Sequence, residues 1–305
     1  MQAIQTLLCA SIDYAGLFPP AALDMATAVQ NYARYRSGAD AWALGRFIVP
    51  AARLSEFEAA AAAYLSASMS GRWQLGALTG SDLESDLQSI TAFNHRTAVR
   101  SGGGAIIDSV EVKGSSVPAI EETISHIPQH LQAYVEIPIE GDPAELIATI
   151  GRLSARPKVR TGGVTREAFP RSRDLVRFME RCVTANTPFK CTAGLHHALR
   201  AEYRLTYAPD SLSGVMFGFL NVFLTAALLR SGLPASDAEQ VLEETSPHAF
   251  RVGEREIAWR NHRLDERALR AARETTILSF GSCSFTEPLE DLQSLRLLEP
   301  RAQRA

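Results

Sequence analysis

Short apolar runs alternate with helix-length amphipathic segments along most of this chain. Runs such as 45–50 (GRFIVP), 73–78 (WQLGAL) and 105–112 (AIIDSVEV) have the length of strands, and a segment with helical spacing follows each. Capping-box sequences at 55–58 (SEFE) and 81–84 (SDLE) indicate where two of these helices begin. The runs do not show the alternation of antiparallel hairpins. The pattern therefore predicts parallel strands covered by helices.

Eight strand-then-helix units follow one another between residues 12 and 298. The expected strands, some with their loops, are 12–20, 45–50, 73–78, 105–112, 132–138, 157–163, 188–197 and 276–285. Eight units in 305 residues favour a closed (β/α)8 TIM barrel over an open doubly wound sheet. No GxGxxG motif follows the first strand, in agreement with this choice.

The segment 198–275 departs from the alternation of strands and helices because it is too long for one crossover. It contains an uncharged apolar stretch at 212–229, a Gly-Leu-Pro break at 232–234 and two charged helical stretches. We predict a helical insertion between strands 7 and 8, within a single domain that covers 1–305. The apolar stretch reaches the length of a membrane span, but it is interrupted by small and polar residues and has no basic flank. It is predicted to be a buried helix.

Composition and charge narrow the class of partners. The chain has 31 basic and 34 acidic residues, a formal charge of -3 and no long run of either sign, so no surface for nucleic acid or anionic membrane is expected. The four cysteines lack disulfide or zinc spacing, and the amino terminus lacks a signal-peptide pattern. We expect a cytoplasmic protein with a small-molecule partner, and homo-oligomer formation is left open.

The predicted strands end in polar and mostly charged residues, and chemistry in such a barrel takes place at these ends. They are Asp13, Arg46, Thr79, Asp108, Glu111, Lys113, Glu136, Lys158, Arg160, Lys190, His196, His197, Ser282 and Ser284. Lys158 and Lys190 lie on consecutive strands, each four residues before a glycine, and are expected to face the same spot. One ammonium would then lower the pKa of the other, and a neutral lysine amine is a nucleophile for carbonyl carbon.

The motifs, in their order along the chain, resemble the class I aldolases typified by deoxyribose-phosphate aldolase. Residues 158–162 (KVRTG) resemble that family's Lys-Thr-Ser-Thr-Gly, whose lysine forms the Schiff base, and 190–194 (KCTAG) its Lys-Ala-Ser-Gly-Gly, whose lysine tunes the first. Residues 107–114 (IDSVEVKG) look like the strand that carries its proton-shuttling aspartate. Residues 280–284 (FGSCS) are similar to its phosphate loop, and 12–19 (IDYAGLFP) to its first strand.

The resemblance implies a lyase that needs no metal and no cofactor. Lys158 would form an iminium with a small carbonyl substrate, and Asp108 would move protons. Lys190 would be the cation that keeps the free amine of Lys158 neutral. Substrate contacts would come from Arg160, Glu136, Gly162, Gly163, Gly194, His196, His197, Gly281, Ser282 and Ser284. Arg160 stands where the family has a small hydroxyl residue and suits a carboxylate, whereas the glycines and serines would suit a phosphate.

Other interpretations of the same residues are open at this stage. Lys158, Arg160 and Lys190 could clamp a carboxylate or phosphate substrate while Asp108 or Glu136 abstracts a proton. The strand ends could instead form a buried ion network, for instance a salt bridge from Lys158 to Glu136. One of the two histidines could join Glu136 and Asp108 in a metal site. Finally, the barrel could be a non-catalytic binding protein that acts through the insertion 198–275.

Overall fold

Eight parallel strands form a closed barrel in the computed structural model, which describes residues 3–67, 71–98 and 104–299. The strands pair in the order β1-β13-β7-β6-β5-β4-β3-β2, and β1 closes the ring against both β13 and β2. The prediction of a (β/α)8 TIM barrel is confirmed. The strands are β1 Ile12–Tyr14, β2 Leu44–Pro50, β3 Trp73–Leu78, β4 Ala105–Lys113, β5 Gln132–Glu136, β6 Arg156–Arg160, β7 Phe189–Thr192 and β13 Ile277–Ser282.

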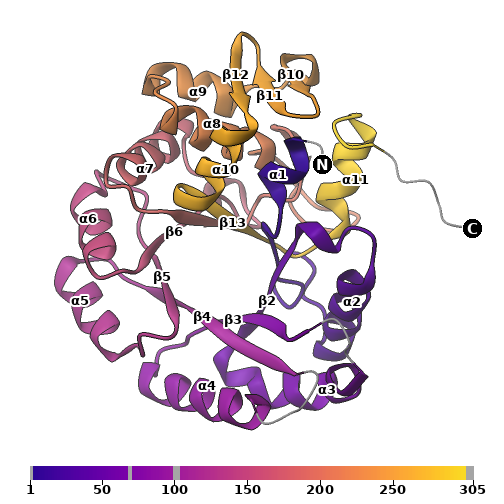
Figure 1. Cartoon of the computed structure of the whole chain (residues 1–305), viewed down its shortest axis with the longest axis vertical. Coiled ribbons are helices and arrows are strands. Elements are labelled where there is room, and N and C mark those ends of the chain that lie inside the picture. The colour runs from indigo at the N-terminus through magenta and orange to yellow at the C-terminus, as the bar shows by residue number, and fades with distance from the viewer. Residues whose placement is uncertain (1–2, 68–70, 99–103, 300–305) are drawn as a thin grey trace, which may run out of the picture.

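Helices surround the barrel (Figure 1). A first helix, α1 Ala3–Leu8, precedes β1 and was not predicted. The helices that follow strands are α2 Met25–Ser37, α3 Leu54–Ala67, α4 Leu83–Ala98, α5 Val117–His126, α6 Ala144–Arg152, α7 Ser172–Thr184, α8 Phe219–Arg230 and α11 Thr286–Ser294. Both predicted capping boxes are displaced. Helix α3 begins at Leu54 after a 3-10 turn, η2 Ala51–Arg53, and at α4 the Asp82 carboxylate accepts from the Ser85 N–H.

The insertion contains two small antiparallel sheets as well as helices, so the prediction of a helical elaboration is incomplete. One sheet pairs β8 Ala201–Arg204 with β9 Ser213–Met216, and the other orders β10 Phe250–Val252, β11 Glu256–Trp259 and β12 His262–Asp265. Helices α9 Ala235–Glu243 and α10 Glu266–Thr275 complete it. Strands of three or four residues are too short to show an alternating pattern, which is why the sequence did not predict them.

Helix α8 is the predicted buried helix. All of its side chains from Phe219 to Leu229 are buried, and it packs on α7, α9, α10 and β13. Its one amide, Asn221, donates to the Val241 and Glu244 carbonyls and accepts from the Arg200 N–H, so hydrogen bonds connect three segments of the insertion to one another. Of the helices in the described ranges, none combines the length and the apolar character that crossing a membrane requires.

Candidate active site

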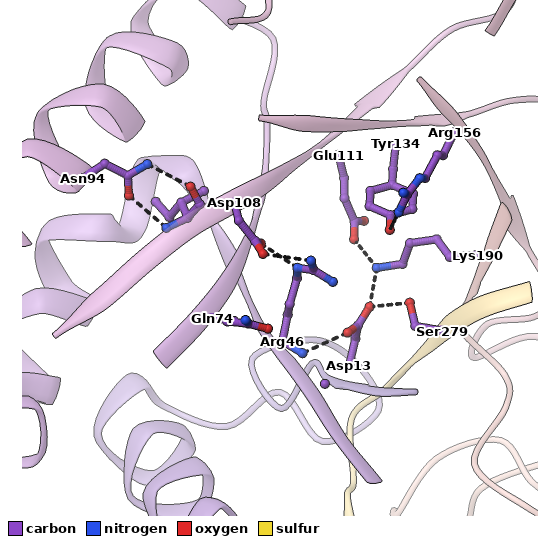
Figure 2. Close-up of polar contacts among 12 residues, drawn as sticks. Asp13, Arg46, Gln74, Asn94, Asp108, Glu111, Tyr134, Arg156, Lys190 and Ser279 are labelled. Carbon is purple, nitrogen blue, oxygen red and sulfur yellow. Dashed lines mark hydrogen bonds and ion pairs between the residues drawn. The ribbon is translucent and has the colours of Figure 1, made fainter. Parts of the chain in front are cut away.

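The two lysines lie side by side inside the barrel. Strand β6 pairs with β7 so that Lys158 is directly opposite Lys190, and their side chains are 4% and 3% exposed. Glu111 of β4 joins them: its Oε2 lies 2.6 Å from Lys158 Nζ and its Oε1 lies 2.7 Å from Lys190 Nζ. One carboxylate therefore bridges two ammonium groups, and Figure 2 shows its contact with Lys190.

Two further carboxylates complete this mouth network. Glu136 Oε2 lies 2.8 Å from Lys158 Nζ, and Asp13 Oδ2 lies 2.6 Å from Lys190 Nζ. The salt bridge from Lys158 to Glu136 is the one that the sequence suggested as an alternative. We use the name mouth network for Asp13, Glu111, Glu136, Lys158 and Lys190. It surrounds two ammonium groups with three carboxylates, so each buried charge has at least one close partner of opposite sign.

The carboxylates of the mouth network determine the protonation of Lys190. Burial by itself disfavours the ammonium form, but Asp13 and Glu111 outweigh burial and raise the pKa of Lys190 above its usual range. The sequence made Lys190 the cation of the pair, and this direction keeps Lys190 protonated. Burial also disfavours the charged form of Glu111, yet the two ammonium groups lower the pKa of Glu111 to about 2.

A second ion pair lies inside the same barrel. The guanidinium of Arg46 on β2 binds the Asp108 carboxylate with two parallel bonds, from Nε to Oδ1 at 2.6 Å and from Nη2 to Oδ2 at 2.8 Å (Figure 2). Asp108 is the extra residue where the pairing of β4 with β3 shifts, and such a bulge turns its side chain toward Arg46. The carboxylate that reaches both lysines is thus Glu111, three residues later on β4, and not the predicted Asp108.

Asp13 connects the two ion clusters. Its Oδ1 accepts from the backbone N–H of Arg46 at 2.9 Å, and its Oδ2 accepts from Ser279 Oγ at 2.8 Å as well as from Lys190 (Figure 2). A side chain at position 45 would collide with this carboxylate, because a Cβ on Gly45 would lie 2.4 Å from Asp13 Oδ1. The glycine before Arg46 therefore lets Asp13 bind both neighbours.

The mouth network opens into a cavity of about 360 Å³ at the carboxyl ends of the strands. Of the predicted site residues, this cavity is lined by Lys158, Lys190, Glu136, Arg160, Gly163, His196 and Gly281. The cavity is also lined by Glu111, Lys113, Thr192 and Cys283, together with apolar side chains. The chain has only three lysines among its 31 basic residues, Lys113, Lys158 and Lys190, and all three line this cavity.

Two predicted substrate-binding glycines are packed against each other and do not line the cavity. A Cβ on Gly162 would lie 2.9 Å from the Gly194 Cα and 2.4 Å from the Phe169 ring. Gly194 also has a φ of +75°, which favours glycine. These glycines let the loops after β6 and β7 cross closely beneath Phe169.

The remaining residues that were predicted to contact substrate are hydrogen bonded to, or stacked on, other side chains of the protein. Ser282 Oγ lies 3.3 Å from His196 Nδ1 and accepts from the Ser284 N–H, while Ser284 Oγ accepts from the Glu287 N–H near the start of α11. His197 Nδ1 lies 3.0 Å from Asp291 Oδ2, and its ring stacks on Tyr203 at 3.5 Å. Of the two histidines, His196 lines the cavity, and burial lowers the pKa of His196 to about 4, so its ring is neutral at pH 7.

The insertion contacts a cavity residue, Cys283, through Tyr207. The Tyr207 hydroxyl lies 3.6 Å from Cys283 Sγ and donates to Glu287 at 3.0 Å, and Cys283 Sγ lies 3.6 Å from His196 Nδ1. Burial raises the pKa of the Cys283 thiol, so the thiol form is favoured. Cys283 is thus a cavity residue that the sequence did not place among the candidate site residues.

Sequence reasoning placed Glu111 and Asp13 at strand ends but gave neither a role. A signal for Glu111 was present. Polar residues occupy every second position at the end of β4, at Ser109, Glu111 and Lys113, and alternate residues of a strand point to the same side. The cluster of lysines was a second signal, since lysine is otherwise absent from this arginine-rich chain.

Within the described ranges, no group of three or more His, Cys, Asp or Glu side chains is arranged to hold a metal ion. Comparison of the chain with protein-family models, with curated proteins and with solved structures finds no match. The closed parallel barrel places the protein in the TIM-barrel fold class, which is commonly enzymatic. Because one fold hosts many activities, the argument for function rests on the side chains of the cavity.

Proposed function

We propose that this protein is a lyase that forms a Schiff base between Lys158 and a small carbonyl substrate, and makes or breaks a carbon–carbon bond. The observation that carries the proposal is the pair of buried lysines, in register on adjacent strands, that share Glu111 at the floor of a cavity. Arginine remains protonated in proteins, whereas lysine can lose its proton and attack a carbonyl carbon. The restriction of lysine to this cavity therefore favours amine chemistry over charge alone.

Glu111 is positioned to prepare the nucleophile. Its Oε2 lies 2.6 Å from Lys158 Nζ, which is within the range for direct proton transfer. When substrate displaces water from the cavity, Lys158 gives one proton to Glu111, and Nζ attacks the carbonyl carbon. Loss of water from the resulting carbinolamine yields the iminium. Lys190 stays protonated beside Asp13, so its charge favours the neutral amine at the neighbouring Lys158.

The iminium then acts as an electron sink. In the cleavage direction, a carboxylate accepts the proton of the hydroxyl group on the β-carbon. The bond from the α-carbon to the β-carbon then breaks, and an aldehyde leaves. The electron pair of that bond forms an enamine on Lys158. Protonation of the enamine and addition of water release the second product and the amine. We assign the proton transfers to Glu111 and Glu136. Asp108 has a positioning role, because it binds the Arg46 guanidinium and the backbone N–H of Arg46 donates to Asp13.

A second candidate is proton abstraction or isomerisation of an anionic substrate, with the lysines and Arg160 as a clamp. It is favoured by the carboxylates that hold both ammonium groups and by the raised pKa of Lys190. In this mechanism Glu136 is the base, because it is the most exposed carboxylate of the mouth network, at 14%. No covalent bond to Lys158 forms.

Reductive trapping separates the candidates. The protein is incubated with a panel of aldehydes and ketones, reduced with borohydride and digested for peptide mass mapping. We expect a stable adduct on Lys158, none on Lys190, and loss of the adduct in Lys158→Ala. Lys113→Arg is the matched control, since it removes the third lysine but keeps the charge, and the Lys158 adduct should persist.

Each other result has a defined meaning. If no carbonyl labels Lys158, while Lys158→Ala abolishes turnover of an anionic substrate, the clamp mechanism replaces the Schiff base. If no substrate is turned over, and Lys158→Ala and Lys190→Ala leave ligand binding intact, the barrel is a binding protein, and the insertion 198–275 becomes the surface to test.

A further inference from the structure

We infer that the substrate of this cavity is a short carboxylate that carries a carbonyl and an apolar substituent, and not a phosphorylated or polyhydroxylated carbonyl compound. The inference rests on the proposed function where it places the carbonyl at Lys158. The cavity's two walls and its size support it independently. At about 360 Å³ it is near the lower end of the usual range for ligand pockets, about 300–1,000 Å³, and suits a small molecule.

One wall of the cavity is apolar. Ala15, Phe18 and Pro19 from the loop after β1 line it together with Ile48 and Leu78 near the ends of β2 and β3. These three strands are neighbours in the barrel, so the wall is continuous. A Cβ on Gly76 would lie 2.9 Å from Ile48 Cδ1, so this glycine makes room for Ile48 inside the barrel. Hydroxyl groups placed against this wall would lose water without gaining a side-chain partner, which is unfavourable.

The opposite wall carries the charges. Glu111, Lys113, Glu136, Lys158 and Lys190 line it from β4, β5, β6 and β7, which are also consecutive in the barrel. The barrel mouth therefore has one apolar sector and one sector that holds all of the charged lining residues, where Val164 and Ala193 of the loops after β6 and β7 also line the cavity. A substrate that spans the cavity needs one apolar end and one polar end.

Two cations stand at the rim of the charged wall beside Lys158. Lys113 is exposed and makes no ion pair among the described residues, and it lies opposite Glu136 in the strand register. Arg160 is 52% exposed, and its contact with Glu136 is 3.5 Å long, whereas Glu136 lies 2.8 Å from Lys158. Both rim cations can therefore reach an anion next to the Lys158 amine, and the planar guanidinium of Arg160 matches a carboxylate.

The residues expected to hold a phosphate are engaged elsewhere. Gly162 and Gly194 pack on each other under Phe169, and the hydroxyls of Ser282 and Ser284 contact His196 and the start of α11. Among the predicted phosphate contacts, Gly163 and Gly281 do line the cavity, where each can offer only a backbone N–H and no charge. The anion site that the cavity offers is the Lys113 and Arg160 rim, which favours a carboxylate attached close to the carbonyl.

The test uses matched carbonyl probes in the borohydride assay on the full chain. The probes are 4-methyl-2-oxopentanoate, pyruvate, 4-methylpentan-2-one and glyceraldehyde 3-phosphate. We expect 4-methyl-2-oxopentanoate to label Lys158 fastest, with a rate constant about 10-fold or more above pyruvate, because it adds methyl and methylene groups to the apolar wall. Equal or faster labelling by glyceraldehyde 3-phosphate, compared under the same conditions, would overturn the inference and leave the Schiff-base proposal standing.

Two variants test the contributions of the apolar wall and of the rim cations separately. Ile48→Thr should reduce the preference for 4-methyl-2-oxopentanoate over pyruvate, whereas Arg160→Gln should slow both acids about equally and leave 4-methylpentan-2-one unchanged. Leu78→Thr repeats the first test at a less buried position in case Ile48→Thr folds poorly. Val215→Thr is the control, because Val215 is 49% exposed and does not line the cavity. An unchanged preference in both Ile48→Thr and Leu78→Thr argues against the apolar wall as a subsite.

Binding of unreactive acids shows whether the substrate inference is wrong or only the Schiff-base proposal is wrong. 4-Methylpentanoate and glycerate cannot form a Schiff base, so calorimetric titration with each reports the cavity alone. We expect 4-methylpentanoate to bind about 10-fold or more tightly than glycerate, and Arg160→Gln to weaken it. If this order holds while no carbonyl labels Lys158, only the lyase proposal is lost. If glycerate binds as tightly or more tightly, the inference is wrong whatever the trapping shows.

Discussion

The barrel encloses two ion clusters that differ in how their charges are shared. In the Arg46–Asp108 pair, one guanidinium meets one carboxylate through two parallel bonds, and each oxygen of Asp108 has its own donor. In the mouth network, Glu111 gives one oxygen to each of two lysines, and each lysine holds a second carboxylate. The first cluster is a single ion pair, whereas in the second Glu111 and both lysines each have two partners of opposite charge.

This difference separates a fixed charge pair from one that can exchange protons. Arginine keeps its proton and its fork fixes the carboxylate, so the Arg46–Asp108 pair is suited to hold the strand geometry below the cavity. Lysine can be deprotonated, and a carboxylate shared by two ammonium groups can accept a proton from either. The cluster that lines the cavity is the one built from lysine. We therefore expect substitutions in the two clusters to have different consequences.

The largest effect is expected for Glu111→Gln. This change leaves two nearly buried ammonium groups without their common carboxylate, and breaking a buried pair in this way costs about 3–5 kcal/mol. Under the proposed mechanism it also removes a proton-transfer group, so we expect the rate of adduct formation at Lys158 to fall about 100-fold or more. Urea unfolding and borohydride trapping measure the two effects.

The matched control for Glu111→Gln is Glu121→Gln. Glu121 forms an ion pair of 2.7 Å with Arg152, but the two side chains are 45% and 59% exposed. Such a surface pair contributes about 0–1 kcal/mol, so the control should unfold nearly as the parent chain does. A Glu111→Gln variant with the stability of this control would show that the mouth network does not stabilise the fold.

Acid should weaken the mouth network within a defined pH window. The pKa of Glu111 in the folded chain is about 2, below the usual 4.5 of a glutamate, so its contribution to stability is complete above about pH 4.5 and is lost as the pH falls toward 2. The difference in unfolding free energy between the parent chain and Glu111→Gln should therefore shrink across this window, by up to about 3 kcal/mol. Urea unfolding at pH 5, 4 and 3 measures it, and a constant difference would contradict the assigned pKa.

A smaller effect is expected for Asp108→Asn. The pair is 24% and 30% exposed, so water can replace part of the lost contact, and we expect about 1–3 kcal/mol of destabilisation. Adduct formation at Lys158 should change much less than in Glu111→Gln. Adding Arg46→Met should recover part of the lost stability, because it removes the unpaired guanidinium. A loss of trapping as large as that of Glu111→Gln would return the proton-transfer role to Asp108.

The contrast between the clusters also shows what the sequence could predict. Strand and helix periodicity is local, so the eight units, the barrel and the buried helix α8 followed from it. The proximity of Lys158 and Lys190 followed as well, because consecutive parallel strands place their ends side by side. The small sheets of the insertion did not follow, since their strands are too short for a pattern.

The partners of each charge depend on register, which the sequence does not display. A single extra residue in β4 turns Asp108 toward Arg46 and leaves Glu111 in line with the lysines. A one-residue shift reverses which side chains face the barrel interior, so a motif match could not distinguish Asp108 from Glu111. The same holds for Gly162 and Gly194, whose close approach is a tertiary contact between two loops.

The smallest effect on stability is expected for Arg160→Gln, and it sharpens the comparison because this residue belongs to neither cluster. Arg160 is 52% exposed and lies 3.5 Å from Glu136, so its contribution to the unfolding free energy should be below about 1 kcal/mol. Binding of 4-methylpentanoate should nevertheless weaken, since a rim cation acts on the ligand rather than on the fold. Paired urea and calorimetric titrations of the parent and Arg160→Gln measure this separation. A variant that loses stability as Asp108→Asn does, with unchanged binding, would place Arg160 among the structural ion pairs and leave the carboxylate without its predicted guanidinium.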